Sequence, residues 1–224
     1  IGFLFFLACP DIFTSGLFGK QDLTNSKDLS NIKILEFGSN RGLMKLEKKS
    51  DYHHSKIFSC LVIPEVFISE CNYLFNFSLK CAIINPKINF IWRLHPGISF
   101  KKLLKKNKFL QKLPNNIQLS TNPIENDIAK CKWVLYRGSS AIFKAISYGL
   151  RPIYLENFNE ISIDPLFRLD FFKKNISNPD ELISLIESDI KNNFINQKSN
   201  LDKIRLFCTK QFSKINLSVI ENFL

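Results

Sequence analysis

The chain has 224 residues, 45% of them hydrophobic, and a formal net charge of +11 at pH 7. This length and composition suit one substantial hydrophobic core with a fragment of a second, and they exclude a disordered or low-complexity chain. The nine apolar residues at the start are too few to span a membrane and have no basic flank, so we expect them to belong to a buried element.

The positive charge does not by itself indicate nucleic-acid binding. A lysine cluster between Lys101 and Lys108 alternates with leucine and phenylalanine at helical spacing, which is typical of a solvated helix face. No nucleic-acid-binding module is present. We therefore expect no nucleic-acid partner, and attraction to a phosphorylated substrate or peripheral contact with an anionic membrane explains the charge equally well.

The six cysteines form no CxxC pair and have no metal-ligand spacing with the three histidines. They lie within apolar segments, as small buried thiols do, which indicates a reducing compartment and a cytoplasmic location. His53-His54 has neither Cys nor carboxylate ligands beside it. We therefore predict no metal site and no cofactor.

The first part of the chain, residues 1–42, contains two short predicted strands around a polar helical segment. Asp11 to Gly16 indicates a strand and turn, and Ile32 to Phe37 a second strand that ends in Gly38-Ser39-Asn40-Arg41-Gly42. Residues 43–56 are charged and show no sustained period, so we interpret them as a linker.

Residues 57–200 alternate strands with helices. Strands are predicted at Ile57–Ile63, from Ile88 to an end in His95-Pro96-Gly97, and at Ile117–Ser120, Lys132–Tyr136 and Ile153–Leu155. Helices are predicted from Ser69, in the lysine-rich segment, from Thr121, after Ser140 and from Pro179. This alternation predicts an α/β fold with a Rossmann-like parallel sheet flanked by helices. A last helical stretch is expected over 201–224.

Gly138-Ser139-Ser140 is the most informative turn, since it follows an apolar strand and opens an amphipathic helix. Gly138 would let a ligand approach the backbone, and Ser139 and Ser140 would cap the helix and leave its first N–H groups for an anion. Arg137 would add a charged fork. Many βαβ turns carry Gly-Ser without binding anything, so the motif alone leaves phosphate binding open.

A second strand ends in Arg93-Leu94-His95-Pro96-Gly97, where Pro96 and Gly97 turn the chain. The sheet would deliver His95 to the same edge as Ser139 and Ser140. Two carboxylates follow other strands of this sheet: Glu65 could face the same cleft, and Glu156 could accept hydrogen bonds from a ribose, although both also suit ordinary loop positions.

With these motifs in place, residues from about Leu61 to Leu169 resemble the C-terminal, nucleotide-sugar-binding half of GT-B-fold glycosyltransferases. They look most like bacterial surface-polysaccharide enzymes with a His-Pro and a Ser-Ser motif, such as sialyl-, polysialyl- and Kdo-transferases. The resemblance implies that Arg93, His95, Pro96, Arg137, Gly138, Ser139 and Ser140 contact a CMP-, CDP- or UDP-linked sugar. It also implies that His95 is catalytic.

The same resemblance makes residues 1–42 the remnant of an N-terminal Rossmann-like domain. It implies inverting, metal-independent transfer to a glycan or lipid-linked acceptor, with the general base upstream of Ile1. Three alternatives stay open: a UDP-sugar 2-epimerase, a glycerophosphotransferase on the same scaffold, and a non-catalytic nucleotide-binding module.

Overall fold

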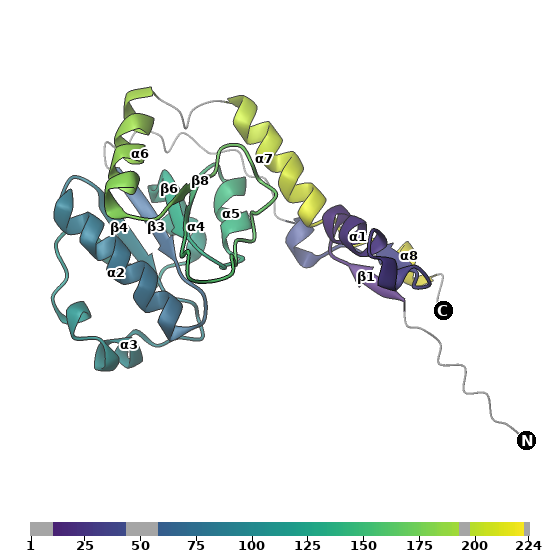
Figure 1. The fold of residues 1–224 in the computed structure, drawn as a ribbon, viewed down its shortest axis with the longest axis horizontal. Helices are drawn as coiled ribbons and strands as arrows, with labels where there is room; N and C mark the ends of the chain where they lie inside the picture. The colour runs from purple at the N-terminus through teal and green to yellow at the C-terminus, as the bar shows by residue number, and fades with distance from the viewer. Residues whose placement is uncertain (1–10, 44–57, 193–197, 222–224) are drawn as a thin grey trace, which may run out of the picture. The chain divides into compact units, whose positions relative to one another are not determined.

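The structure is a computed structural model that describes residues 11–43, 58–192 and 198–221. The chain forms two compact units (Figure 1), a smaller one of residues 1–46 and 202–224 and a larger one of residues 47–201. The expected linker at 43–56 and the apolar start of the sequence fall almost wholly outside the described residues. Within the described ranges, no helix has both the length and the apolar character that crossing a membrane requires.

The larger unit is built on one six-stranded, all-parallel sheet with the order β5-β4-β3-β6-β7-β8. Its strands are β3 (Ser59–Ile63), β4 (Asn89–Arg93), β5 (Ile117–Ser120), β6 (Trp133–Tyr136), β7 (Arg151–Leu155) and β8 (Lys174–Ile176). The chain runs outward from β3 to β5 and then returns to place β6 on the other side of β3. The predicted parallel sheet is thereby confirmed.

Helices connect the strands, as parallel pairing requires. They are α2 (Ile68–Ile84), α3 (Phe100–Lys106), α4 (Ile124–Lys130), α5 (Ile142–Ser147) and α6 (Pro179–Asn192), with a 3-10 turn, η4 (Lys108–Gln111), after α3. Helices α2 and α6 lie side by side over the sheet (Figure 1). Helices α4 and α5 contact β3, β6 and β7.

The core is built from strands that each contain an unbroken run of apolar residues. All five residues of β3 and all four of β6 are buried. Cys60 and Val62 belong to the cluster that packs with α2 and α6, whereas the equally buried Leu61 and Ile63 lie outside that cluster. Successive strand side chains point to opposite faces, so the uninterrupted apolar runs fit a sheet covered on both sides.

Three local features differ from the sequence prediction. Strand β8 was not predicted, because only Ile176 of its three residues is buried and apolar. Helix α5 begins at Ile142 and not directly after Ser140. The single helix expected over 201–224 is two helices, α7 (Lys198–Gln211) and α8 (Ser218–Glu221), with extended chain between them.

The smaller unit combines the two ends of the sequence. Its parallel strands β1 (Ile12–Thr14) and β2 (Ile34–Glu36) are joined by α1 (Leu17–Thr24) and the 3-10 turn η1 (Lys27–Leu29), and a second 3-10 turn, η2 (Asn40–Leu43), follows. The amide of Ser39 donates to the carbonyl of Ser213, and the amide of Asn216 donates to the carbonyl of Phe37. A side chain is impossible at Gly38, whose φ is +93° and where an added Cβ would lie 2.2 Å from the Lys214 carbonyl oxygen.

Candidate functional site

The candidate site lies at the carboxyl edge of the larger unit's sheet. Strands added after β3 lie on one side of it up to β5, and those from β6 on lie on its other side, so the strand order reverses between the parallel neighbours β3 and β6. The crevice outside the carboxyl ends of such a strand pair is where open α/β sheets bind ligands. Glu65 follows β3, and Arg137 and Gly138 follow β6. The motif residues predicted from the sequence are therefore all at this edge.

Arg93, the last residue of β4, is held by structural partners. Its Nη1 forms an ion pair with Asp127 Oδ2 at 2.9 Å and also donates to the Asn122 carbonyl. Asp127 is buried on α4 and accepts a second bond from Ser120 Oγ at 2.6 Å. Arg93 thus ties β4 to β5 and α4, and only about a fifth of its side chain is exposed.

His95 is exposed, and its orientation is set by its own turn. The Gly97 amide donates to His95 Nδ1 at 3.1 Å, and the Ile98 amide donates to the His95 carbonyl at 2.9 Å. Because Nδ1 accepts, the neutral ring carries its proton on Nε2, which is left to donate to a ligand. Pro96 beside it is exposed as well.

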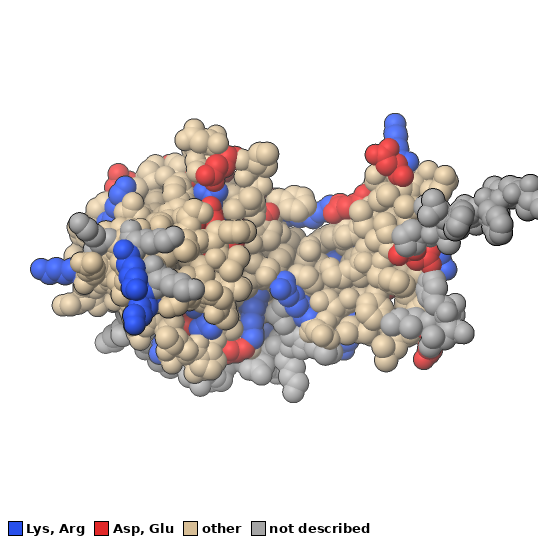
Figure 2. Space-filling model, turned by 90° about the horizontal axis from the view of Figure 1, so that it is seen from below, with Lys and Arg blue, Asp and Glu red and all other residues tan. Residues whose placement is uncertain are grey.

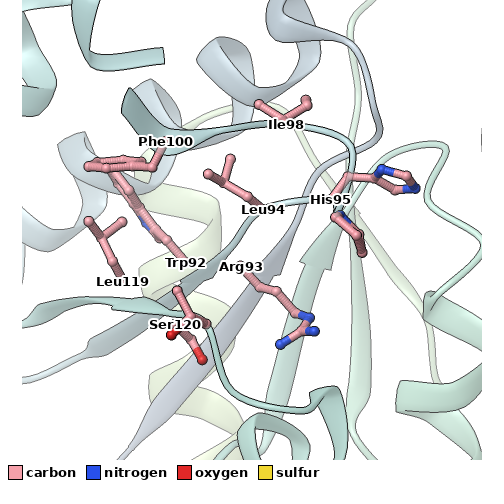
Figure 3. A pocket seen from close by; sticks show the side chains of 10 residues that line it. Trp92, Arg93, Leu94, His95, Ile98, Phe100, Leu119 and Ser120 are labelled. Carbon is pink, nitrogen blue, oxygen red and sulfur yellow. The ribbon is translucent and has the colours of Figure 1, made fainter. Parts of the chain in front are cut away.

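A pocket of about 370 Å³ opens between the ends of β4 and β5. In Figure 3, Phe100 and Leu119 stand at one side of it and the His95 imidazole at the other, with the Arg93 side chain directed away from both. Ser120 and Thr121 add hydroxyl groups to the lining. A mostly apolar cavity with a few polar groups is the usual form of a small-molecule site.

The Gly138-Ser139-Ser140 turn lacks the predicted helix caps. Neither serine side chain bonds to α5, whose N-cap residue is Ala141; instead, the carbonyls of Ser139 and Ser140 accept from the amides of Ile142 and Phe143. The two serines therefore meet the first N–H groups of the helix through their carbonyls and not through their hydroxyls. Within the described residues, the amides of Ser139 and Ser140 donate no hydrogen bond.

Glu65 contacts this turn directly. Its Oε1 accepts from the Gly138 amide at 2.8 Å, and a Cβ added to Gly138 would lie 2.2 Å from the same oxygen. The glycine therefore makes room for a carboxylate of the protein itself. An anionic group already occupies one donor of the turn.

The Arg137 guanidinium is not available to a ligand as predicted, because the side chain is only 2% exposed and other side chains of the protein surround it. Nη2 donates to Glu160 Oε2 at 2.7 Å, Nε forms an ion pair with Glu70 Oε2 at 3.0 Å, and the guanidinium stacks on the Tyr73 ring at 4.9 Å. Nη1 is buried without a hydrogen-bond partner among the described residues. Arg137 thus joins α2 to the segment after β7.

Desolvation dominates the electrostatics of this cluster. Burial raises the pKa of Glu70, an effect that Arg137 opposes and the nearby Glu65 and Glu160 reinforce. Burial likewise raises the pKa of Tyr73. Glu65, Glu70 and Glu160 together outnumber the one guanidinium, so the local charge around Arg137 is negative.

Glu156 follows β7 and is held by neighbouring strands. Its Oε1 accepts from Asn175 Nδ2 at 2.7 Å, and its carbonyl accepts from the Tyr73 hydroxyl at 3.2 Å. A second, more polar pocket of about 390 Å³ lies beside it, lined partly by Asn157, Ser162 and Lys173. Nothing in the described parts of the chain donates to Glu156 Oε2.

Several residues of the site were not predicted. Asp127, Glu70, Tyr73 and Glu160 hold the two arginines, and Phe100 and Leu119 line the pocket. The only sequence signal for them was an arginine at the end of each of two apolar strands, where a buried guanidinium needs carboxylate partners. Among the described residues, no group of three or more His, Cys, Asp and Glu could hold a metal ion.

No protein-family model matches the sequence, and no curated protein matches it either. Solved structures do resemble it. The Anabaena Alr3699/HepE complex with UDP and glucose has a TM-score of 0.60 at 14% identity, with 95% of this chain and 62% of that chain covered. TarM has a TM-score of 0.60 at 15% identity, covering 95% of this chain and 42% of that chain.

The Methanocaldococcus jannaschii UDP-GlcNAc 2-epimerase, in complex with UDP-GlcNAc and UDP, has a TM-score of 0.53 at 15% identity. The alignment covers 88% of this chain and 60% of that one. The chain therefore spans roughly half the length of its structural neighbours, between 42% and 62% in these three cases. At such identities the likeness shows the fold, a GT-B-like Rossmann domain, as predicted.

Proposed function

We propose that the larger unit binds the nucleotide-activated sugar donor of a glycosyltransferase. The observation that carries the proposal is the pairing, at one sheet edge, of an apolar pocket beside His95 with a turn whose Ser139 and Ser140 amides donate no hydrogen bond within the described residues. Three structural neighbours were solved with UDP, one of them with glucose as well. Their fold supports the same class of ligand here.

A pyrimidine nucleotide fits the dimensions of the edge. The pocket lies at β4 and β5, the turn follows β6, and β3 separates them. Two strand spacings put the ends of β4 and β6 about 10 Å apart. The base would enter the pocket, the ribose would lie over the end of β3, and the phosphates would reach Gly138, Ser139 and Ser140.

The chemistry follows from where negative charge would develop. When the sugar leaves, charge grows on the nucleotide phosphate, and donors fixed beforehand stabilise it at little reorganisation cost. His95 Nε2–H and the serine groups are such donors. We propose inverting, metal-independent transfer, which agrees with the lack of an Asp-x-Asp sequence.

The acceptor and the setting are proposals as well. A glycan or lipid-linked acceptor of surface-polysaccharide synthesis suits the His-Pro and Ser-Ser motifs of the sequence. The buried free thiols Cys60, Cys71, Cys81 and Cys131 suit a reducing, cytoplasmic environment. Peripheral contact with the membrane would bring the enzyme to a lipid-linked acceptor.

Binding of UDP, CDP and CMP, measured by calorimetry with and without EDTA, tests the proposal. We expect binding that survives EDTA, weakened by about 1–3 kcal/mol in S139A/S140A because two groups facing a charged phosphate are lost. Ser188→Ala, at an exposed position of α6, is the control and should bind as the wild type does. Equal affinity of wild type and double mutant would refute a phosphate contact by the two serine hydroxyls, and no binding of any of the three nucleotides would refute the donor site.

A UDP-sugar 2-epimerase is a second candidate, favoured by the carboxylates of Glu65, Glu70 and Glu160 near the turn. Burial raises the pKa of the Glu70 carboxyl, and a carboxyl group with a raised pKa is suited to moving protons. Incubation with UDP-GlcNAc, followed by proton NMR, separates the two functions. A new 2-epimer without an added acceptor would favour the epimerase.

A further inference from the structure

The charge of the chain is concentrated in one segment. From Cys71 to Ile124 the sequence has no Asp or Glu. The same segment holds most of the net positive charge, on Lys80, Lys87, Arg93, Lys101, Lys102, Lys105, Lys106, Lys108 and Lys112. It comprises most of α2 and all of β4, α3, η4 and β5. The strands β4 and β5 lie next to each other at one end of the sheet.

An apolar groove of about 650 Å³ lies within this basic segment. Its walls come from α3, η4 and the edge strand β5: Phe100, Leu104, Leu110, Leu113 and Leu119, with Gln111 and the exposed Lys101 and Lys105 beside them. Leu119 is 39% exposed although it belongs to a strand. We call this region the α3 groove.

Helix α3 buries one leucine in the core and presents another leucine, with two lysines, to the α3 groove. Leu103 is fully buried in the core, whereas Leu104 lines the groove between Lys101 and Lys105, which are one helical turn apart. Figure 2 views the larger unit from the side on which α3 lies in Figure 1, and blue side chains protrude from that part of the surface.

We propose that the α3 groove docks on an anionic lipid membrane. Lysines would contact the headgroups while the leucines and Phe100 enter the boundary with the acyl chains, as basic amphipathic helices do. The absence of any acidic residue from Cys71 to Ile124 supplies the charge complementarity. This surface goes beyond nucleotide binding, since apart from Phe100 and Leu119 its lining residues lie outside the pocket beside His95.

A lipid surface fits the groove better than a nucleic acid does. Proteins that track single strands present aromatic faces on which bases stack, together with a charged path for the backbone. Here four of the five apolar walls are leucines, and the one aromatic, Phe100, is only partly exposed. Leucine side chains suit acyl chains.

The α3 groove lies next to the pocket beside His95, which suggests how membrane binding would serve the proposed function. Phe100 and Leu119 line both the α3 groove and the pocket beside His95. A membrane at the groove would therefore lie next to the proposed donor pocket. That placement would suit transfer to a lipid-linked acceptor.

Co-sedimentation of the whole chain with vesicles tests the proposal. Vesicles of phosphatidylcholine alone and of phosphatidylcholine mixed with phosphatidylglycerol are compared, at low and at high salt. We expect binding only to the anionic vesicles, weaker at high salt, and reduced at least tenfold in K101E/K105E. Leu104→Asn should weaken binding with no change of charge.

The matched control is K174E/K191E, which changes the net charge by the same amount at exposed lysines outside the basic segment. It should alter vesicle binding less than about threefold, since only nearby lysines contribute strongly. Equal losses in the two pairs, no wild-type binding to anionic vesicles, or unchanged binding of Leu104→Asn would overturn the proposal. So would tighter binding of a single-stranded oligonucleotide at the same lysines.

UDP binding by K101E/K105E separates this proposal from the donor-site proposal. Unchanged UDP affinity with lost vesicle binding supports the groove as an independent surface. Loss of UDP binding together with vesicle binding would contradict that independence. Circular dichroism confirms that each variant is folded.

Discussion

The two sides of the larger unit's sheet are made by different physical means. In the β4–β5 half, residues 71–124, every charged residue is basic. Apolar contacts hold this half together, such as the stacked rings of Phe75 and Trp92 with centroids 4.3 Å apart. From Glu125 to Asn192, ten Asp and Glu oppose nine Lys and Arg, and several of these are paired in the interior. The β4–β5 half therefore has an excess of positive charge, whereas positive and negative charges nearly balance in the β6–β8 half.

Two buried ion pairs characterise the β6–β8 side. Asp189 of α6 pairs with Arg151 Nη1 and accepts from Trp133 Nε1 at 2.8 Å. Asp164 pairs with Lys173 at 2.6 Å and accepts from the Tyr136 hydroxyl at 2.8 Å, and burial together with Asp164 raises the pKa of Tyr136. Buried charges are tolerated only when paired, so this side depends on specific partners.

The largest expected effect is the loss of stability when one of these buried partners, Asp189, is removed. Asp189→Ala would remove the carboxylate that pairs with the buried Arg151 and accepts from the Trp133 N–H, and we expect the free energy of unfolding to fall by about 3–5 kcal/mol. Urea denaturation measures it. Glu187→Ala, exposed on the same helix, should cost less than about 1 kcal/mol, and comparable losses in both variants would contradict the contrast between the sides.

A second prediction concerns Glu65, at the point where the two sides meet. Its carboxylate occupies the Gly138 amide, so an entering phosphate must displace it and bear its repulsion. We expect Glu65→Gln to tighten UDP binding about five- to tenfold, within the range of one charged hydrogen bond.

Calorimetry at neutral pH decides this prediction. Glu125→Gln changes the net charge equally at the surface and should leave UDP affinity unaltered. Weaker UDP binding by Glu65→Gln would mean that the carboxylate holds the ligand, for instance through a ribose hydroxyl, and does not compete with it.

The smallest expected effect lies at the surface. A hydrogen bond from Lys144 lowers the pKa of Glu125, so the pair stabilises the fold above the ordinary glutamate pKa and loses this contribution as pH falls through the lowered value. Glu125→Gln should cost no more than about 0.5 kcal/mol at pH 7. Urea titrations at neutral and strongly acidic pH should show the difference vanish in acid; a constant difference would contradict the assignment.

The sequence predicted the sheet well, because its strands are apolar at successive positions and end in turn residues. The same reasoning placed Arg93, His95, Glu65 and Gly138 at one edge. It missed β8, since a three-residue strand with two exposed positions carries almost no pattern.

What the sequence could not predict is how side chains pair. Arg137 was expected to be a ligand fork, yet Glu70 and Glu160 enclose it from segments remote in the chain. Ser139 and Ser140 were expected to cap α5, but where a helix begins depends on packing that no local motif fixes. Tertiary contacts decide both.

The hydrogen bonds between residues 213–216 and residues 15–39 affect the order in which the two units can fold during synthesis. Ser213 and Asn216 bond to Ser15, Phe37 and Ser39, so the smaller unit draws on both ends of the sequence, whereas the larger one is continuous. During synthesis the larger unit can fold as soon as its own residues have left the ribosome. In the smaller unit β1 can pair with β2 early, but the bonds to Ser213 and Asn216 must wait until those residues are made. Contacts of such high sequence separation form slowly.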